Sequence, residues 1–103
     1  MIVVSVMYPG GADATFDEGY YLQTHIPLVR ERWRGMGLSD VRLLRGAGTP
    51  DGGAPPYRVT ALLTFGSLSE FQAAAQAYGG EIFADIPKFT NVQPLVQINE
   101  ILT

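Results

Sequence analysis

The chain has a single histidine, His25, and imidazole is the one side chain whose ordinary pKa, about 6.5, allows proton exchange near neutral pH. Tyr20 and Tyr21 nearby, and the more distant Tyr8, carry hydroxyls that can donate a hydrogen bond to a developing oxyanion. Pro27 follows in the same segment and distorts any helix that contains it. A base beside such a distortion can reach a substrate in an apolar cleft. The alternative is a buried histidine that is bonded to a neighbour and has no chemical role.

The composition leaves few other reactive groups or ligand sets. The absence of cysteine removes disulfides, thiolate nucleophiles, iron–sulfur clusters and cysteine zinc sites. One histidine without an H-x-x-x-H spacing gives no metal site, and no G-x-S-x-G elbow marks a nucleophilic serine. The pairs Gly10-Gly11 and Gly52-Gly53 are typical of turns rather than of a dinucleotide or phosphate loop. We therefore expect neither a metal nor a bound cofactor.

The charge balance argues against nucleic acids and membranes as partners. Seven lysines and arginines stand against ten acidic residues, a net charge of −3, and no basic stripe is present. No apolar run approaches the ~18 residues of a membrane span, and no basic signal-like segment is visible, so a cytoplasmic location is expected. The 103 residues make one domain, 47% hydrophobic and only 17% charged. This composition indicates either an unusually apolar surface or a surface that is partly covered by another chain.

The first part of the chain predicts a strand followed by a long helix. β-Branched and apolar residues form the strand Ile2–Tyr8. The helix covers residues 15–36, and either Thr15 or Asp17 can cap its start. Pro27 inside this helix predicts a kink, because proline lacks an N–H donor and its ring clashes with the preceding turn.

The remainder predicts a hairpin, a second helix and a final strand. The hairpin joins Asp40–Gly48 to Tyr57–Phe65 through a loop of turn-forming residues. A capping box at Ser67 and Glu70 starts the helix, and Gly79-Gly80 is expected to end it. The last two expected elements are one short turn in Glu81–Pro87 and a strand over Val92–Leu102, where Pro94 suits an edge, a bulge or a strand start.

The element order is β-α-β-β-α-β, which is that of a ferredoxin-like α+β domain. This topology predicts a four-stranded antiparallel sheet with two helices on one face. The other face mixes apolar and polar side chains, namely Val3, Met7, Leu62, Leu95 and Ile101 among Ser5, Thr60, Thr64, Gln93, Gln97 and Asn99. We expect a homodimer in which two such faces close on each other. The alternative is a monomer with some exposed apolar residues.

The segment FDEGYYLQTHIPL, residues 16–28, resembles the EthD-like family, small proteins associated with ethyl tert-butyl ether degradation. The family pattern is roughly F-D-x-x-Y-Y-x-x-x-H-x-P-L after a strand that ends in Tyr-Pro, here Tyr8-Pro9. Residues 85–91, DIPKFTN, are similar to the family's loop before the last strand. The resemblance implies subunits that form a dimeric α+β barrel. By this resemblance, five residues occupy positions of the family motif, namely His25, Tyr20, Tyr21, Asp17 and Pro27.

Several functions are compatible with these features. The first is a cofactor-independent enzyme of catabolic or secondary metabolism that transfers protons on an apolar carbonyl or phenolic molecule, in dehydration, isomerisation, cyclisation or oxygenation. The second is a non-catalytic small-molecule-binding accessory protein, and a haem protein is a less favoured third. The resemblance implies a superfamily of monooxygenases, cyclases, isomerases, dehydratases and haem enzymes, and some family names suggest a reductase. The expected catalytic residues are His25, Tyr21 and Tyr20, and the expected ligand-binding residues are Tyr8, Trp33, Phe65 and Phe83.

Overall fold

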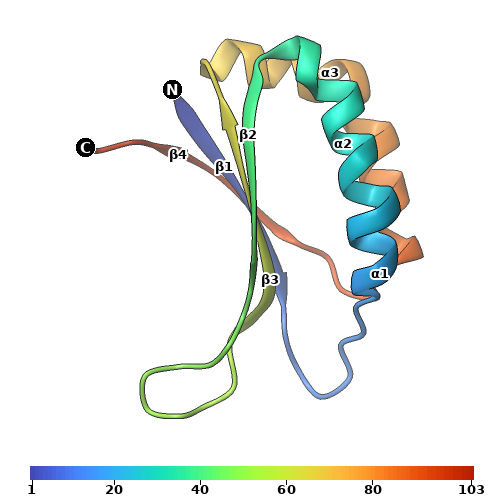
Figure 1. Ribbon diagram of the computed structural model, residues 1–103, viewed down its shortest axis with the longest axis vertical. Helices are drawn as coiled ribbons and strands as arrows, with labels where there is room; N and C mark the ends of the chain where they lie inside the picture. The colour runs from blue at the N-terminus through green and yellow to red at the C-terminus, as the bar shows by residue number, and fades with distance from the viewer.

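The computed structural model describes residues 1–103, which form one sheet with two helical stretches packed on one of its faces (Figure 1). No helix is long and apolar enough to cross a membrane. In chain order the elements are β1 (Ile2–Pro9), α1 (Glu18–Tyr20), the π-helical segment η1 (Tyr21–His25), α2 (Ile26–Trp33), the 3₁₀ turn η2 (Arg34–Met36), β2 (Leu38–Arg45), β3 (Tyr57–Phe65), α3 (Leu68–Asp85), the 3₁₀ turn η3 (Ile86–Lys88) and β4 (Leu95–Glu100).

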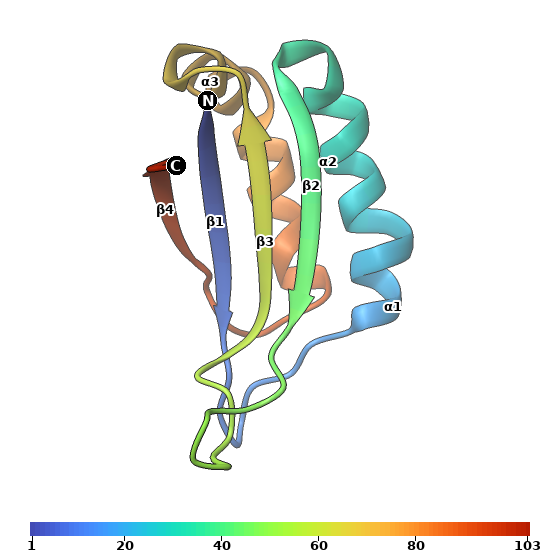
Figure 2. The same cartoon turned by 60° about the vertical axis from the view of Figure 1, so that its left-hand side comes forward.

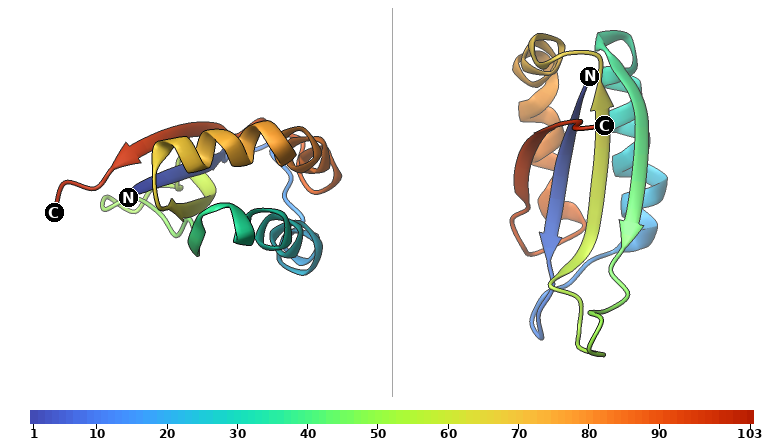
Figure 3. Two further views of the ribbon diagram at one scale, coloured as in Figure 1. Left: turned by 90° about the horizontal axis from the view of Figure 1, so that it is seen from above. Right: turned by 90° about the vertical axis from the view of Figure 1, so that its left-hand side faces the viewer.

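The four strands pair antiparallel in the order β2-β3-β1-β4, as Figure 2 shows from the side of the sheet. β1 is central, and its Val4 lies opposite Leu63 of β3 and Ile98 of β4. All helices lie on one face of this sheet, behind the strands in the right-hand view of Figure 3. The predicted ferredoxin-like α+β arrangement is confirmed. Side chains alternate between the two faces of a strand, and in β3 every second one is buried against the helices, namely Val59, Ala61, Leu63 and Phe65.

Two groups of buried side chains fill the space between helices and sheet. One group surrounds Phe65 and Trp33, and the Trp33 indole N–H donates to the Ala74 carbonyl at 2.8 Å, which ties α2 to α3. The other lies at the opposite end of the sheet and is mainly aromatic. Its edge-to-face ring contacts join Tyr8, Phe16, Tyr21 and Phe89 at centroid distances of 4.9–5.9 Å. This second group forms the surroundings of His25.

The first helical stretch begins later than residue 15, and next to Pro27 it contains a π turn. Asp17, and not Thr15, caps it, because the Asp17 carboxylate accepts from the Tyr20 N–H at 3.1 Å. The turn before Pro27 widens into η1, where the Ile26 N–H bonds the Tyr21 carbonyl five residues back. A π turn relieves the clash that a proline ring makes with the turn before it. The regular helix ends at Trp33, and η2 completes the stretch.

The second helix contradicts the expected stop at Gly79-Gly80. α3 continues through both glycines to Asp85, so the short turn expected in Glu81–Pro87 is its last turn followed by η3. Each glycine costs a helix about 1 kcal/mol relative to alanine. Buried contacts of Ile82 and Asp85 beyond them outweigh that local preference. The extension matters because it carries Asp85 to the side of the first helical stretch.

Two strands also differ in their bounds. β2 begins earlier than Asp40 and ends at Arg45 rather than Gly48. β4 covers only part of the expected Val92–Leu102, because the residues just before it bond the loop that follows β1 instead of the sheet. There the Asn91 side chain donates to the Asp13 carbonyl at 2.8 Å, and the Thr90 hydroxyl donates to the Thr15 carbonyl at 2.6 Å. Pro94 therefore precedes the strand. In Figure 1 β4 leaves toward the side of the sheet that has no helices.

Candidate functional site

The site is built where three elements meet inside the aromatic group. η1 ends at His25, which is buried, and α3 ends at Asp85, which is only 9% exposed. β1 contributes Tyr8 from the sheet below them. Helix packing thus brings together two ionisable side chains that lie 60 residues apart in sequence. Asp85 is the functional residue that the sequence analysis did not assign.

A hydrogen-bonded network centres on the Asp85 carboxylate. Its Oδ2 lies 2.9 Å from His25 Nδ1, and its Oδ1 accepts from the Tyr20 hydroxyl at 2.8 Å. The Lys88 Nζ lies 3.7 Å from the same Oδ1 and is largely exposed. Burial alone would raise the pKa of Asp85, but the hydrogen bonds from His25 and Tyr20 outweigh it and hold that pKa below its usual value. Asp85 is therefore an ionised acceptor at neutral pH.

The charge state of His25 follows from its burial. Desolvation lowers the pKa of His25, and the neighbouring Asp85 offsets this only in part. The imidazole is therefore neutral at pH 7 and carries one proton. Because the Asp85 carboxylate can only accept, that proton lies on Nδ1, and Nε2 keeps a free lone pair. A histidine in this state has the lone pair that a general base requires.

A small cavity of about 40 Å³ lies beside the imidazole, between the helices and the sheet. Apolar side chains make up nearly all of its wall. The hydroxyls of Tyr8 and Tyr21 and the Nε2 of His25 form no hydrogen bond within the chain. None of the three atoms is fully enclosed, and their residues line this cavity. The volume has room for about one water molecule, whose share of liquid volume is about 30 Å³.

The two tyrosine hydroxyls remain protonated donors. Burial raises the pKa of Tyr8, with a smaller contribution from its neighbour Tyr21, and burial alone raises the pKa of Tyr21. The Tyr21 ring stacks on His25 with a centroid distance of 5.7 Å and an interplanar angle of 16°. The Phe89 ring is tilted against the imidazole at a centroid distance of 4.6 Å and also contacts Tyr21 at 5.1 Å, so the three rings form one cluster. The imidazole is thus packed against two aromatic rings, next to two neutral donors.

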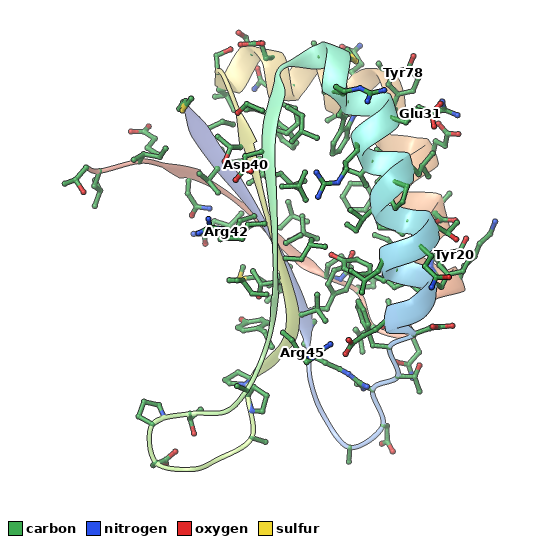
Figure 4. All side chains as sticks on the ribbon, in the orientation of Figure 1. Tyr20, Glu31, Asp40, Arg42, Arg45 and Tyr78 are labelled. Carbon is green, nitrogen blue, oxygen red and sulfur yellow. The ribbon has the colours of Figure 1, made fainter.

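The structure brings most of the expected site residues together. Five of them line the cavity, namely His25, Tyr21, Tyr8, Trp33 and Phe83. Tyr20, labelled in Figure 4, lies outside it, because its hydroxyl is directed to Asp85. Phe65 lies in the other buried group and lines no part of the cavity. Asp17 and Pro27 shape the helix around η1 and do not line the cavity either.

Asp85 and Phe89 were the contacts that sequence reasoning missed. Both lie in DIPKFTN, so the signal for them was the family resemblance of that segment rather than any helix pattern. No three His, Cys, Asp or Glu side chains gather closely enough to hold a metal ion. The arrangement offers a base, a carboxylate that orients it and two hydroxyl donors. Such a set of groups is capable of proton transfer.

The lowered pKa of His25 can be measured directly, because the chain has one imidazole. We predict an NMR titration midpoint below the value of about 6.5 for an exposed histidine. Asp85→Asn should lower the midpoint further, since it removes the influences that raise the pKa. Between the folded and unfolded pKa values the unfolded chain binds more protons, so folding stability should fall as the pH falls through that window. A folded midpoint at or above that of the urea-unfolded chain would contradict the assignment.

Comparisons with known proteins agree with this architecture. No protein-family model and no curated protein matches the chain. The crystal structure of an EthD-like protein from Ralstonia eutropha JMP134 is 34% identical with a TM-score of 0.90, and the match covers 99% of this chain and 92% of that one. An EthD family protein from Bacillus halodurans C-125 is 22% identical with a TM-score of 0.79, covering 99% of both chains.

A dimeric ferredoxin-like protein from an uncultured marine organism has the same fold at a TM-score of 0.59, with 11% identity and coverage of 100% of this chain and 96% of that one. The similarity to the Ralstonia eutropha protein combines 34% identity with nearly complete coverage of both chains. It agrees with the motif around His25 and with the observed topology. The chain therefore belongs to the EthD-like family.

Proposed function

We propose that this chain is a cofactor-independent enzyme in which His25 transfers a proton on an apolar small molecule that carries a carbonyl or phenol group. The proposal is supported by His25, which is oriented by Asp85 through Nδ1, has an Nε2 without a partner in the chain, and lines an apolar cavity. A general base must lie within hydrogen-bond reach of the proton it removes. In this site no other cavity-lining group has a basic lone pair at neutral pH.

The reaction begins when Nε2 of His25 removes a proton from the carbon next to a carbonyl. The electron pair of the broken C–H bond moves onto the carbonyl oxygen, which becomes an enolate. The hydroxyls of Tyr8 and Tyr21 donate to that oxygen as its charge develops. The imidazolium then returns its proton to a different atom of the substrate, which completes an isomerisation, or to a departing hydroxyl, which completes a dehydration. The enzyme regains its starting state in both cases.

The other residues of the site serve this step indirectly. Asp85 holds the proton on Nδ1 and stabilises the imidazolium while it exists. Tyr20 acts as a positioning residue, because its hydroxyl holds the Asp85 carboxylate and does not open onto the cavity. Trp33 and Phe83 supply apolar wall that excludes water from the substrate. Phe65 supports that wall through its edge contact with Trp33 at 5.7 Å.

Proton transfer can be tested before the natural substrate is identified. The cavity holds about one water molecule, so a ketone must displace part of the cavity wall to reach Nε2. We predict that the protein accelerates exchange of the acidic C–H protons of 2-tetralone in D₂O, as measured by NMR. General base catalysis supplies roughly 10²–10⁴-fold, and His25→Gln should abolish that acceleration. Tyr21→Phe should weaken it, whereas Tyr78→Phe, at an exposed tyrosine on α3, should leave it unchanged.

Equal exchange rates with the native chain and with His25→Gln would refute the base assignment. Saturable binding of 2-tetralone without any exchange would instead favour the non-catalytic binding role. Circular dichroism of each variant establishes that the fold is retained.

We also propose that a second copy covers the helix-free face of the sheet. Leu44 and Leu95 are 46% and 53% exposed there. Figure 4 shows Asp40 and Arg42 of β2 on the side away from the helices, and neither forms an ion pair within the chain. Opposite charges two positions apart make this face self-complementary under a twofold axis. One structural neighbour is itself described as dimeric.

The dimer predicts a mass in solution of twice 11.2 kDa, measurable by light scattering after gel filtration. Leu44→Lys should shift the protein toward the monomer, because it places a charge in the buried interface. Leu68→Lys is the matched control, since Leu68 is 43% exposed on α3, on the other side of the sheet. A monomeric native chain, or equal effects of the two substitutions, would contradict the proposal.

A further inference from the structure

A broad groove runs along the outer side of the cavity wall. It lies between the end of α3, η3 and the segment that leads into β4, and it encloses about 1030 Å³. Its apolar lining includes Phe83, Ile86, Phe89 and Val92. Gln93, which is exposed, also lines the groove. Pockets that bind small molecules typically measure about 300–1,000 Å³. The groove therefore has the size of a ligand site, which the cavity beside His25 does not.

The groove and the cavity share part of their walls. Phe83 and Ile86 line both, and Phe89, which lines the groove, contacts the His25 ring at 4.6 Å. Ile86 and Phe89 are buried, whereas Phe83 is 45% exposed. Phe83 is thus the one shared side chain with free space to turn into. Its rotation would join about 40 Å³ beside the base to about 1030 Å³ outside.

The charged groups of the groove are already engaged. Lys88 lies 3.7 Å from the Asp85 carboxylate, and Asp17 accepts the Tyr20 N–H at the start of α1. The apolar surface that a ligand can contact comes mainly from Phe83 and Val92, because Ile86, Phe89 and Phe16 are buried. Burial of apolar area is the contribution that such a surface makes to affinity. A neutral, apolar group fits this groove better than a carboxylate or an ammonium group.

We infer that the cavity and the groove are two halves of one substrate site, divided by Phe83. The substrate class is then an elongated neutral molecule, with a phenol or carbonyl head at His25 and an apolar tail in the groove. This inference rests on the proposed function for the head and on the groove alone for the tail. Phe83 is the side chain that determines how large a substrate can reach the base.

The tail site can be tested with a series of 4-alkylphenols from 4-propylphenol to 4-heptylphenol, titrated by calorimetry. Each methylene that the groove buries should tighten binding about fourfold, so the whole series should span at least tenfold in dissociation constant. Gln93→Trp fills the groove from an exposed position and should reduce the span to less than threefold. Gln76→Trp, an equally exposed site on α3 outside the groove, should leave the span unchanged.

A dissociation constant that does not depend on alkyl length in the native chain would overturn the inference. So would a length dependence that survives Gln93→Trp, because the tail would then bind elsewhere. His25→Gln should weaken every member of the series by a similar factor and keep the length dependence. 2-Tetralone has no alkyl tail, so its exchange tests the base without the length dependence that the groove predicts. Exchange without a length dependence would contradict the groove only, and a length dependence without exchange would contradict the proposed function only.

Discussion

The buried contact between His25 and Asp85 is the interaction on which the site depends. It joins the end of η1 to the end of α3 across 60 residues of sequence. A buried carboxylate is costly unless it is hydrogen-bonded, and here both oxygens have a donor, His25 on one and Tyr20 on the other. The same contact decides which imidazole nitrogen keeps its proton. The contact therefore links the packing of α3 against η1 to the protonation pattern that the proposed chemistry requires.

The surrounding elements serve to hold that pair in place. Pro27 lacks the N–H of a regular helical bond, and a π turn spans Tyr21–His25 just before it. Across this turn the rings of Tyr21 and His25 stack on each other. On the sheet side, Tyr8 projects from β1 into the same group. Figure 4 shows Arg45 reaching from β2 toward α1, where it bonds the Glu18 carboxylate and links the sheet edge to the first helix.

The sequence predicted the topology well, because local signals and burial pattern agree along most of the chain. Alternation in β3 and the capping box at Ser67 are local features, and the structure contains both. Prediction failed where tertiary contacts override local preference. Gly79 and Gly80 are poor helix formers, yet α3 passes through them, and the expected stop there concealed Asp85. The partner of His25 is set by helix packing, which spacing along one helix does not reveal.

The most direct measurement is the ¹⁵N NMR spectrum of the one imidazole above neutral pH, which distinguishes the two neutral tautomers from the imidazolium. The structure predicts a protonated Nδ1, bonded to Asp85, and an unprotonated Nε2. A protonated Nε2, in either the other tautomer or the imidazolium, would remove the free lone pair from the cavity. That result would contradict the role of His25 as a base.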